Sequence, residues 1–272
     1  MSAPRILILR APGTNCDGET AFAFERAGAQ PTSCHINQLL ESPNRTKDFQ
    51  ILCIPGGFSY GDDIAAGRIM ASQIRHHLRD ALHQFKADGK LILGICNGFQ
   101  VLIKAGVLLV DGDGGEPATL TWNQTGRFQD RWVHLAANGD RCVFLRGIER
   151  MYLSIAHAEG RFVTRDNATL QQLEQNSQLA LRYAFEPNEQ AHAATFSRQE
   201  SNGAELPFPI NPNGSTANVA GLCDDTGRVF GLMPHPERHI DRTQHPRWTR
   251  GEGRDPGDGL AIFQNAVRYF AN

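Results

Sequence analysis

A cysteine between two glycines is the residue of this sequence best suited to nucleophilic chemistry. An apolar run, Leu91–Ile95, leads into Cys96, which has Gly94 and Gly98 two residues away on either side. A helical pattern begins near Asn97, so the segment resembles the strand–turn–helix elbow of hydrolases with Cys in place of Ser. Glycines permit such a tight turn and close approach of another chain segment. We therefore predict an exposed Cys96 at the amino end of a helix, where backbone amides and a nearby imidazolium lower a thiol pKa.

A histidine and a glutamate follow another apolar run, and their side chains could act as the base and the orienting carboxylate that activate the cysteine. His235 and Glu237 come after Val229–Met233 and alternate with Pro234 and Pro236. Pro236 favours an extended backbone at His235, and alternate residues of an extended segment project to the same side. The carboxylate can then orient the imidazole, which gives a Cys–His–Glu triad.

A pair of glycines provides candidate donors for the oxyanion that forms during acyl transfer. The run Phe49–Ile54 ends in Pro55-Gly56-Gly57-Phe58. Backbone N–H groups near a nucleophile can stabilise a tetrahedral oxyanion. We expect the N–H of Gly57 or Phe58 to act together with that of Asn97, although a glycine turn after a strand is by itself more often only a turn.

Other histidines and cysteines compete for these roles. His157 and Glu159 have the same spacing as the preferred pair and also follow a strand-like run. The flanking prolines favour His235. Cys16 lies in a polar turn and is a weaker nucleophile candidate, and His245 has no carboxylate two residues later. The remaining cysteines are expected in the core: Cys34, Cys53, Cys142 and Cys223.

The elements that must position these residues alternate between strand and helix in the first 110 residues. Apolar runs without alternation are typical of strands covered on both faces, and the order predicts a parallel sheet with helices on both sides. Ligands of such sheets bind at the carboxyl ends of the strands, where Cys96 and Gly57 lie. The expected strands are Arg5–Arg10, Phe49–Ile54 and Leu91–Ile95, and the expected helices are Glu19–Ala27, Ile74–Lys86 and Phe99–Ala105.

The second half is less regular. The segment Glu186–Asn213 is polar and rich in Pro and Asn, which predicts an extended loop or insertion in a single domain of residues 1–272. Asp111–Gly115 is predicted to be a glycine-rich turn. Further strands are expected at Arg131–Ala136, Met151–Ile155, Leu179–Phe185, Val219–Cys223 and Val229–Met233, with a last helix at Leu260–Phe270.

Composition excludes several classes of protein. The formal net charge is −2 and charged residues make up 21% of the chain, so nothing indicates a nucleic-acid partner. The apolar runs are too short for a membrane span, and the amino terminus lacks the pattern of a signal peptide. The six cysteines contain no CxxC pair, which disfavours zinc and disulfides. We therefore expect a cytoplasmic protein with free thiols and no metal.

Three separate motifs together resemble class I (triad-type) glutamine amidotransferases. They are Pro55–Asp63, the elbow around Cys96 and Pro234–Arg238. The continuation Phe-Ser-Tyr-Gly-Asp-Asp after Gly57 is most similar to the glutaminase subunits or domains of phosphoribosylformylglycinamidine synthase, an enzyme of purine biosynthesis. Further matches are Pro12–Asp17, Ile155–Arg161 and Asn211–Ser215, so the resemblance covers nearly the whole chain.

The resemblance implies a flavodoxin-like α/β fold with a parallel or mixed sheet. It also implies glutamine hydrolysis through a γ-glutamyl thioester on Cys96 and delivery of ammonia to a separate synthetase subunit, which converts formylglycinamide ribonucleotide to its amidine. Gln100 is expected to bind glutamine, with His157 and Glu159 near the same pocket. No cofactor is expected in this chain, because the synthetase uses ATP and magnesium, and a small bridging subunit is a further expected partner.

Two other functions remain open at the level of sequence. One is a different cysteine hydrolase of related fold, although such enzymes usually place the histidine soon after the nucleophile, whereas His235 lies far downstream of Cys96. The other is a catalytically silent regulatory subunit. Such a subunit is expected to lack Cys96, His235 or Glu237, and all three are present.

Overall fold

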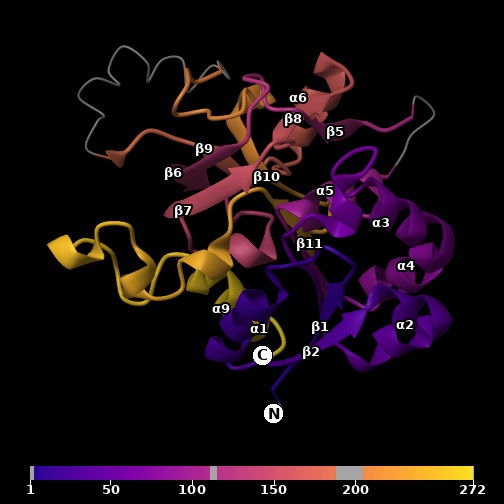
Figure 1. Cartoon of the computed structure of the whole chain (residues 1–272). Coiled ribbons are helices and arrows are strands. Elements are labelled where there is room, and N and C mark those ends of the chain that lie inside the picture. The colour runs from indigo at the N-terminus through magenta and orange to yellow at the C-terminus, as the bar shows by residue number, and fades with distance from the viewer. Residues whose placement is uncertain (1–2, 111–114, 188–204, 272) are drawn as a thin grey trace.

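The computed structural model describes residues 3–110, 115–187 and 205–271. A nine-stranded sheet with the order β2-β1-β3-β4-β11-β10-β9-β6-β7 runs through the molecule (Figure 1). The strands are β1 (Arg5–Arg10), β2 (Gln30–His35), β3 (Ile51–Ile54), β4 (Leu91–Ile95), β6 (Gln129–Ala137), β7 (Arg150–His157), β9 (Leu181–Tyr183), β10 (Val219–Cys223) and β11 (Val229–Leu232). A separate ladder joins β5 (Ala118–Thr121) to β8 (Arg161–Thr164).

The first half of the sheet is parallel, as expected. Strand β1 pairs in parallel with β2 and β3, β3 with β4, and β4 with β11. Every residue of β3, β4 and β11 is buried, which explains their continuous apolar runs. The remaining strands, from β11 to β7, pair antiparallel. The fold is therefore a mixed sheet flanked by helices.

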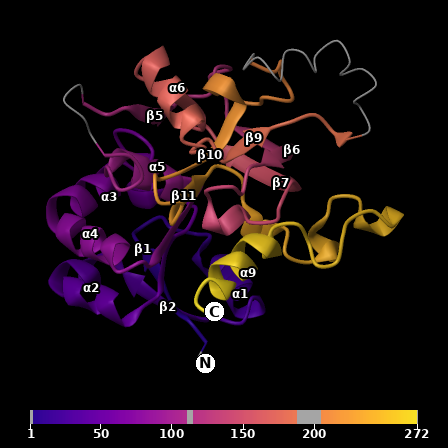
Figure 2. The ribbon, with the colours of Figure 1, turned by 180° about the vertical axis from the view of Figure 1, so that it is seen from behind.

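Helices cover both faces of the parallel half. Helices α1 and α9 lie together on one side, with Phe24 and Phe263 packed edge to face at 4.9 Å between ring centroids, and α2 to α5 lie on the other side (Figures 1 and 2). Among the described residues, no helix combines the length and the apolar character that crossing a membrane requires. The helices are α1 (Asp17–Arg26), α2 (Ile36–Glu41), α3 (Arg68–Gln73), α4 (Arg79–Ala87), α5 (Asn97–Lys104), α6 (Asn167–Gln175) and α9 (Leu260–Arg268).

Several elements differ from the sequence-based prediction. The predicted helix Ile74–Lys86 is a π-helical turn, Ile74–Leu78, continued by α4. Strand β2 was not predicted, because it is a polar edge strand in which only Cys34 is fully buried. Strands β5 and β8 and helices α2 and α6 were not predicted either.

Parts of two predicted loops lie outside the described residues, namely 111–114 and 188–204. At the described end of the expected insertion, two asparagine side chains donate to backbone carbonyls. Asn213 is fully buried and donates to the Gly160 carbonyl at 2.8 Å, and Asn211 donates to the Ser215 carbonyl at 2.9 Å. Asn213 therefore holds the chain against the turn that follows β7, and Asn211 fixes the local turn that ends at Ser215.

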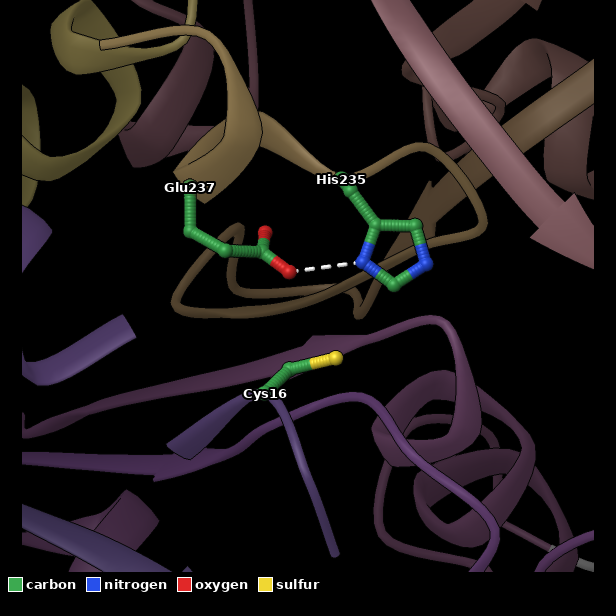
Figure 3. Close-up of side chains that lie close together, drawn as sticks. All are labelled: Cys16, His235 and Glu237. Carbon is green, nitrogen blue, oxygen red and sulfur yellow. Dashed lines mark hydrogen bonds and ion pairs between the residues drawn. The ribbon is translucent and has the colours of Figure 1, made fainter. Parts of the chain in front are cut away.

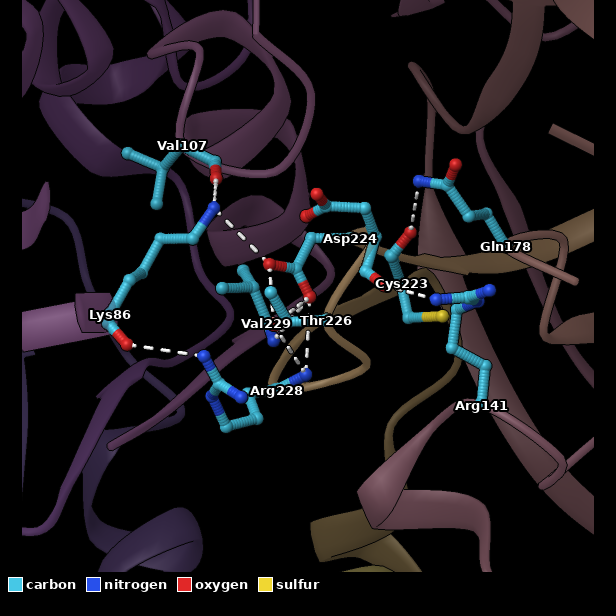
Figure 4. Close-up of polar contacts among 10 residues, drawn as sticks. Lys86, Val107, Arg141, Gln178, Cys223, Asp224, Thr226, Arg228 and Val229 are labelled. Carbon is cyan, nitrogen blue, oxygen red and sulfur yellow. Dashed lines mark hydrogen bonds and ion pairs between the residues drawn. The ribbon is translucent and has the colours of Figure 1, made fainter. Parts of the chain in front are cut away.

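A buried carboxylate anchors the turn between β10 and β11 (Figure 4). Asp224 accepts the backbone N–H of Arg228 at 3.1 Å and of Val229 at 3.0 Å through Oδ1. Its Oδ2 pairs with Lys86 of α4 at 3.1 Å, and Lys86 also donates to the Val107 carbonyl at 3.2 Å. This network fixes β11 beside β4 at the end of the strands opposite His235.

The glycine after the cysteine is required by packing. A Cβ added to Gly98 would lie 1.8 Å from the carbonyl oxygen of Ile54, because α5 crosses directly over the end of β3. We expect Gly98→Ala to lower the free energy of unfolding by about 3 kcal/mol or more, at the upper end of the cost of overpacking. Urea denaturation measures this change.

Gly18 provides the matched control, since a Cβ there meets nothing within 4 Å. Gly18→Ala in α1 should leave stability unchanged or raise it by up to about 1 kcal/mol, because alanine favours helix. Equal stability of the two variants would contradict the packing argument.

Candidate active site

The register of β4 and β11 brings the cysteine and the histidine to one edge of the sheet. Ile95 is opposite Leu232 in this parallel pair. Cys96 follows Ile95 directly, and its N–H donates to the Leu232 carbonyl at 2.7 Å. His235 lies three residues beyond Leu232, and its N–H donates to the Ser154 carbonyl of β7 at 2.8 Å. Parallel pairing therefore places both residues at the carboxyl ends of the strands.

The turn at Cys96 has the strained backbone of an elbow. Its φ of 49° and ψ of −104° lie in a region that a non-glycine residue rarely adopts, at a cost of order 1–3 kcal/mol. Helix α5 begins at the next residue. A Cβ on Gly94 would lie 2.6 Å from the Gly98 carbonyl oxygen, so Gly94 is required for the close contact of β4 with α5, as Gly98 is for that of β3 with α5.

Cys96 is less accessible than predicted. The residue is only 5% exposed, and its Sγ lies 3.7 Å from the carbonyl oxygen of Ala156 near the end of β7. The expectation of an exposed nucleophile is therefore wrong for this conformation. The motif predicts the turn at Cys96 but not the strand β7 that covers the thiol.

His235 and Glu237 form a short, buried pair. Nδ1 of His235 lies 2.6 Å from Oε1 of Glu237, and the two residues are 2% and 1% exposed (Figure 3). The carboxylate can only accept, so Nδ1 carries the proton. The geometry behind the prediction was only partly right: His235 is extended, but Pro236–Arg238 forms a 3-10 turn.

The contact with Glu237 makes the imidazole of His235 a stronger base. Burial alone lowers the pKa of His235, but the Glu237 carboxylate and then the sulfurs of Cys96 and Cys16 outweigh burial and raise this pKa well above its ordinary value. Nε2 of His235 is buried and has no hydrogen-bond partner among the described residues. This nitrogen therefore stays available to a thiol or a substrate.

The predicted oxyanion donors divide into two groups. The N–H of Phe58 donates to the Gly13 carbonyl at 3.0 Å, so it is committed to protein. The amides of Gly57 and Asn97 remain the candidates. The Asn97 side chain joins the two segments, since its Oδ1 accepts the Ser59 N–H at 3.1 Å.

Gln100 makes protein contacts with both ends of its amide. Oε1 accepts from the side chain of Asn97 at 2.9 Å, and Nε2 donates to the Glu159 carbonyl at 2.6 Å. In this conformation the residue ties α5 to the turn after β7. Binding of glutamine by Gln100 stays a prediction.

Glu159 is a buried anchor of the same turn. Its Oε2 accepts the Ala66 N–H at 3.2 Å and lies 3.6 Å from Nζ of Lys104. Desolvation lowers the pKa of Lys104, and Glu159 opposes that shift. The glutamate therefore has partners other than a histidine.

His157, the rival base, is engaged elsewhere. Its Nδ1 lies 3.1 Å from Oδ1 of Asn123 rather than beside Glu159. Burial, together with the nearby charge of His235, lowers the pKa of His157 to about 3. The structure thus forms an imidazole–carboxylate pair at 235 and 237 and not at 157 and 159.

The depressed pKa of His157 predicts a pH-dependent stability. An unfolded histidine has a pKa of about 6.5, so between that pH and pH 3 the unfolded chain binds one more proton than the folded chain. Stability should therefore fall as the pH drops below about 6.5, by up to about 1.4 kcal/mol per pH unit from this residue. Urea denaturation between pH 7.5 and 5 measures the slope. His157→Gln should flatten it by this amount, and an unchanged slope would contradict a neutral buried His157.

Sequence reasoning missed the position of Cys16. This residue, predicted in a polar turn, is 1% exposed, and its Sγ lies within 4.8 Å of a ring nitrogen of His235 and a carboxylate oxygen of Glu237. Its Sγ accepts from Arg238 at 3.2 Å and donates to Asn15 at 3.3 Å. Burial raises the pKa of the Cys16 thiol, and His235 partly opposes this shift. The only sequence signal was the shared motif Pro12–Asp17.

Comparison with known proteins identifies the family of the chain. Residues 3–270 match the family described as CobB/CobQ-like glutamine amidotransferase domain. The chain is 43% identical to phosphoribosylformylglycinamidine synthase subunit PurQ of Dehalococcoides mccartyi, covering 99% of this chain and 98% of the relative. It is 41% identical to the subunit of that name from Methanococcus maripaludis strain S2, covering 98% and 97%. A solved structure of PurLQS from Thermotoga maritima superposes with a TM-score of 0.70 at 29% identity, covering 98% of this chain and 99% of that one.

Proposed function

Because the chain belongs to the family of glutamine amidotransferases, among the PurQ subunits of phosphoribosylformylglycinamidine synthase, we propose that it hydrolyses glutamine at Cys96 and passes the ammonia to the synthetase. Ammonia then converts formylglycinamide ribonucleotide to formylglycinamidine ribonucleotide. The observation that carries the proposal is the 2.6 Å pair of His235 and Glu237 at the strand edge that holds Cys96.

The reaction begins with the Cys96 thiol and the His235 imidazole. Nε2 of His235 takes the thiol proton, and Glu237 stabilises the resulting imidazolium through Nδ1. The thiolate attacks the side-chain amide carbon of glutamine and forms a tetrahedral oxyanion. The N–H groups of Gly57 and Asn97 stabilise that oxyanion.

Ammonia leaves when the same imidazolium returns its proton to the amide nitrogen. The carbon–nitrogen bond breaks and a γ-glutamyl thioester remains on Cys96. Water, deprotonated by His235, then hydrolyses the thioester to glutamate and restores the thiol. The raised pKa of His235 suits a group that must hold a proton while a thiolate forms beside it.

The proposal extends to substrate recognition and to partners, and the family of the chain supports both. Gln100, His157 and Glu159 lie at or beside the glutamine pocket, and the contacts of Gln100 rearrange when glutamine binds. The partners are a synthetase subunit, which uses ATP and magnesium, and a small bridging subunit. The complex acts in the cytoplasm, and this chain holds no cofactor of its own.

The test measures glutamate released from glutamine by the chain alone and with the synthetase. Hydrolysis should be slow alone and rise when the synthetase assembles, because partner docking completes the oxyanion hole in amidotransferases of this type. Formation of the amidine product should depend on glutamine unless free ammonia is supplied. A strong preference for a substrate other than glutamine would refute the proposal.

A further inference from the structure

The thiol of Cys16 lies close to the proposed catalytic pair of His235 and Glu237. Sγ of Cys16, a ring nitrogen of His235 and a carboxylate oxygen of Glu237 all lie within 4.8 Å of one another (Figure 3). Cys16 precedes α1, whereas the other two residues follow β11, so the fold brings together segments that are far apart in the sequence. The three residues are 1%, 2% and 1% exposed.

We propose that Cys16, His235 and Glu237 form an inhibitory binding site for a thiophilic divalent cation such as Zn²⁺. Thiolate, imidazole and carboxylate are the ligands that Zn²⁺ binds in proteins, at about 2.0–2.3 Å. Ligands at that distance in a tetrahedral arrangement are roughly 3.5 Å apart. The ligand atoms that are farthest apart therefore have to close by about 1 Å around the ion, and the 2.6 Å contact between His235 and Glu237 has to open by about 1 Å.

A carboxylate oxygen of Glu237 without a hydrogen-bond partner also favours a bound cation. Oε2 of Glu237 is buried and has no hydrogen-bond partner among the described residues. A buried acceptor without a partner is unfavourable, and a cation shared with this carboxylate removes that cost. The backbone at Gly56 closes the group on one side, since a Cβ there would lie 2.8 Å from Cε1 of His235 and 3.1 Å from Sγ of Cys16.

The charge of Arg238 opposes the ion and limits its affinity. Its Nη2 lies 3.2 Å from Sγ of Cys16, while its Nε pairs with Glu19 at 2.9 Å. The arginine side chain is 36% exposed, so it can move outward along with Glu19. We therefore expect Arg238→Gln to bind the cation more tightly than the unsubstituted chain.

Binding would stop catalysis by changing the proton on His235, a consequence that rests on the proposed function. The metal takes Nδ1 and displaces the contact with Glu237, and the ring proton moves to Nε2. Nε2 then cannot accept the proton of Cys96. Cys16 loses its own proton to solvent, so one proton is released per ion and no oxidation or reduction takes place.

Co²⁺ tests the site without reference to activity, since a cobalt–thiolate bond gives a near-ultraviolet charge-transfer band. The band should appear when Co²⁺ is added to the full chain and to Cys96→Ala and Cys34→Ser, and it should be lost in Cys16→Ser. Arg238→Gln should show the band at lower Co²⁺ concentration. A band that is lost in Cys96→Ala, or kept in Cys16→Ser, would overturn the assignment, as would no band in the unsubstituted chain.

Inhibition provides the second arm. Zn²⁺ should inhibit glutamine hydrolysis, a chelator should restore it, and Cys16→Ser should raise the concentration for half-inhibition at least about tenfold, since weaker perturbations of metal sites already cost that much. Equal inhibition of both proteins would refute the inhibitory role. The glutaminase proposal fails separately, if Cys96→Ala still hydrolyses glutamine. In that case the cobalt titration still tests whether the metal site exists.

Discussion

Replacing Cys96 with alanine should reduce glutamine hydrolysis by at least about a thousandfold, because removal of the nucleophile of a triad leaves only the contribution of binding and oxyanion stabilisation. Of the six cysteines, all of which the structure describes, Cys96 alone combines the elbow backbone, the start of a helix and a hydrogen bond to the strand that leads to His235. Glutamate release, measured with the synthetase present, quantifies the loss. Amidine formation from free ammonia should continue, since that step does not use this thiol.

Cys34 and Cys16 provide controls that distinguish loss of the nucleophile from loss of any buried thiol. Cys34→Ala replaces a buried cysteine in β2, away from the site, and should keep ordinary activity. Mass spectrometry of acid-quenched enzyme should find a glutamyl group on the peptide that contains Cys96. An active Cys96→Ala protein, or a glutamyl group on Cys16, would show that the nucleophile has been misassigned.

Replacing His235 with asparagine should cost about a thousandfold or more in kcat, comparable to loss of the nucleophile, since triad residues act as a unit. The variant should also lose the reactivity of Cys96 towards iodoacetamide at neutral pH, because no imidazolium remains to stabilise the thiolate. Steady-state kinetics and the alkylation rate measure the two effects.

His157→Asn is the matched control, since it also replaces a buried histidine, within the segment that covers Cys96. The Nδ1 of His157 contacts Asn123 and its pKa of about 3 keeps it neutral. We expect weaker glutamine binding or coupling, with alkylation of Cys96 preserved. If His157→Asn abolished alkylation and His235→Asn did not, the roles of the two histidines would be reversed.

Local patterns in the sequence predicted the parts of the site that depend on neighbouring residues. The spacing of Gly94 and Gly98 around Cys96 predicted the elbow, and the structure supplies the reason in the contacts of both glycines. The prolines around His235 predicted an extended segment. His235 itself is extended, and the expected imidazole–carboxylate contact forms although Pro236–Arg238 is a 3-10 turn.

Contacts between distant segments were not predictable in this way. The burial of Cys96 depends on β7, and the commitment of the Phe58 N–H depends on the carbonyl of Gly13. Cys16 was predicted only as a weaker nucleophile candidate in a polar turn, because the motif Pro12–Asp17 around it does not indicate that it packs beside His235. Strand β2 was missed since an edge strand with one buried side chain leaves little apolar pattern.

The strained backbone of Cys96 lowers the thermal stability of the protein at the residue that catalysis requires. Its φ of 49° is one that glycine adopts without strain and cysteine does not. A glycine at this position would relax the turn, so an inactive protein would tolerate heat better than the active one. Laboratory evolution of this chain under selection for stability alone should therefore discard the nucleophile, and a stabilised variant must be screened for turnover as well as for melting temperature.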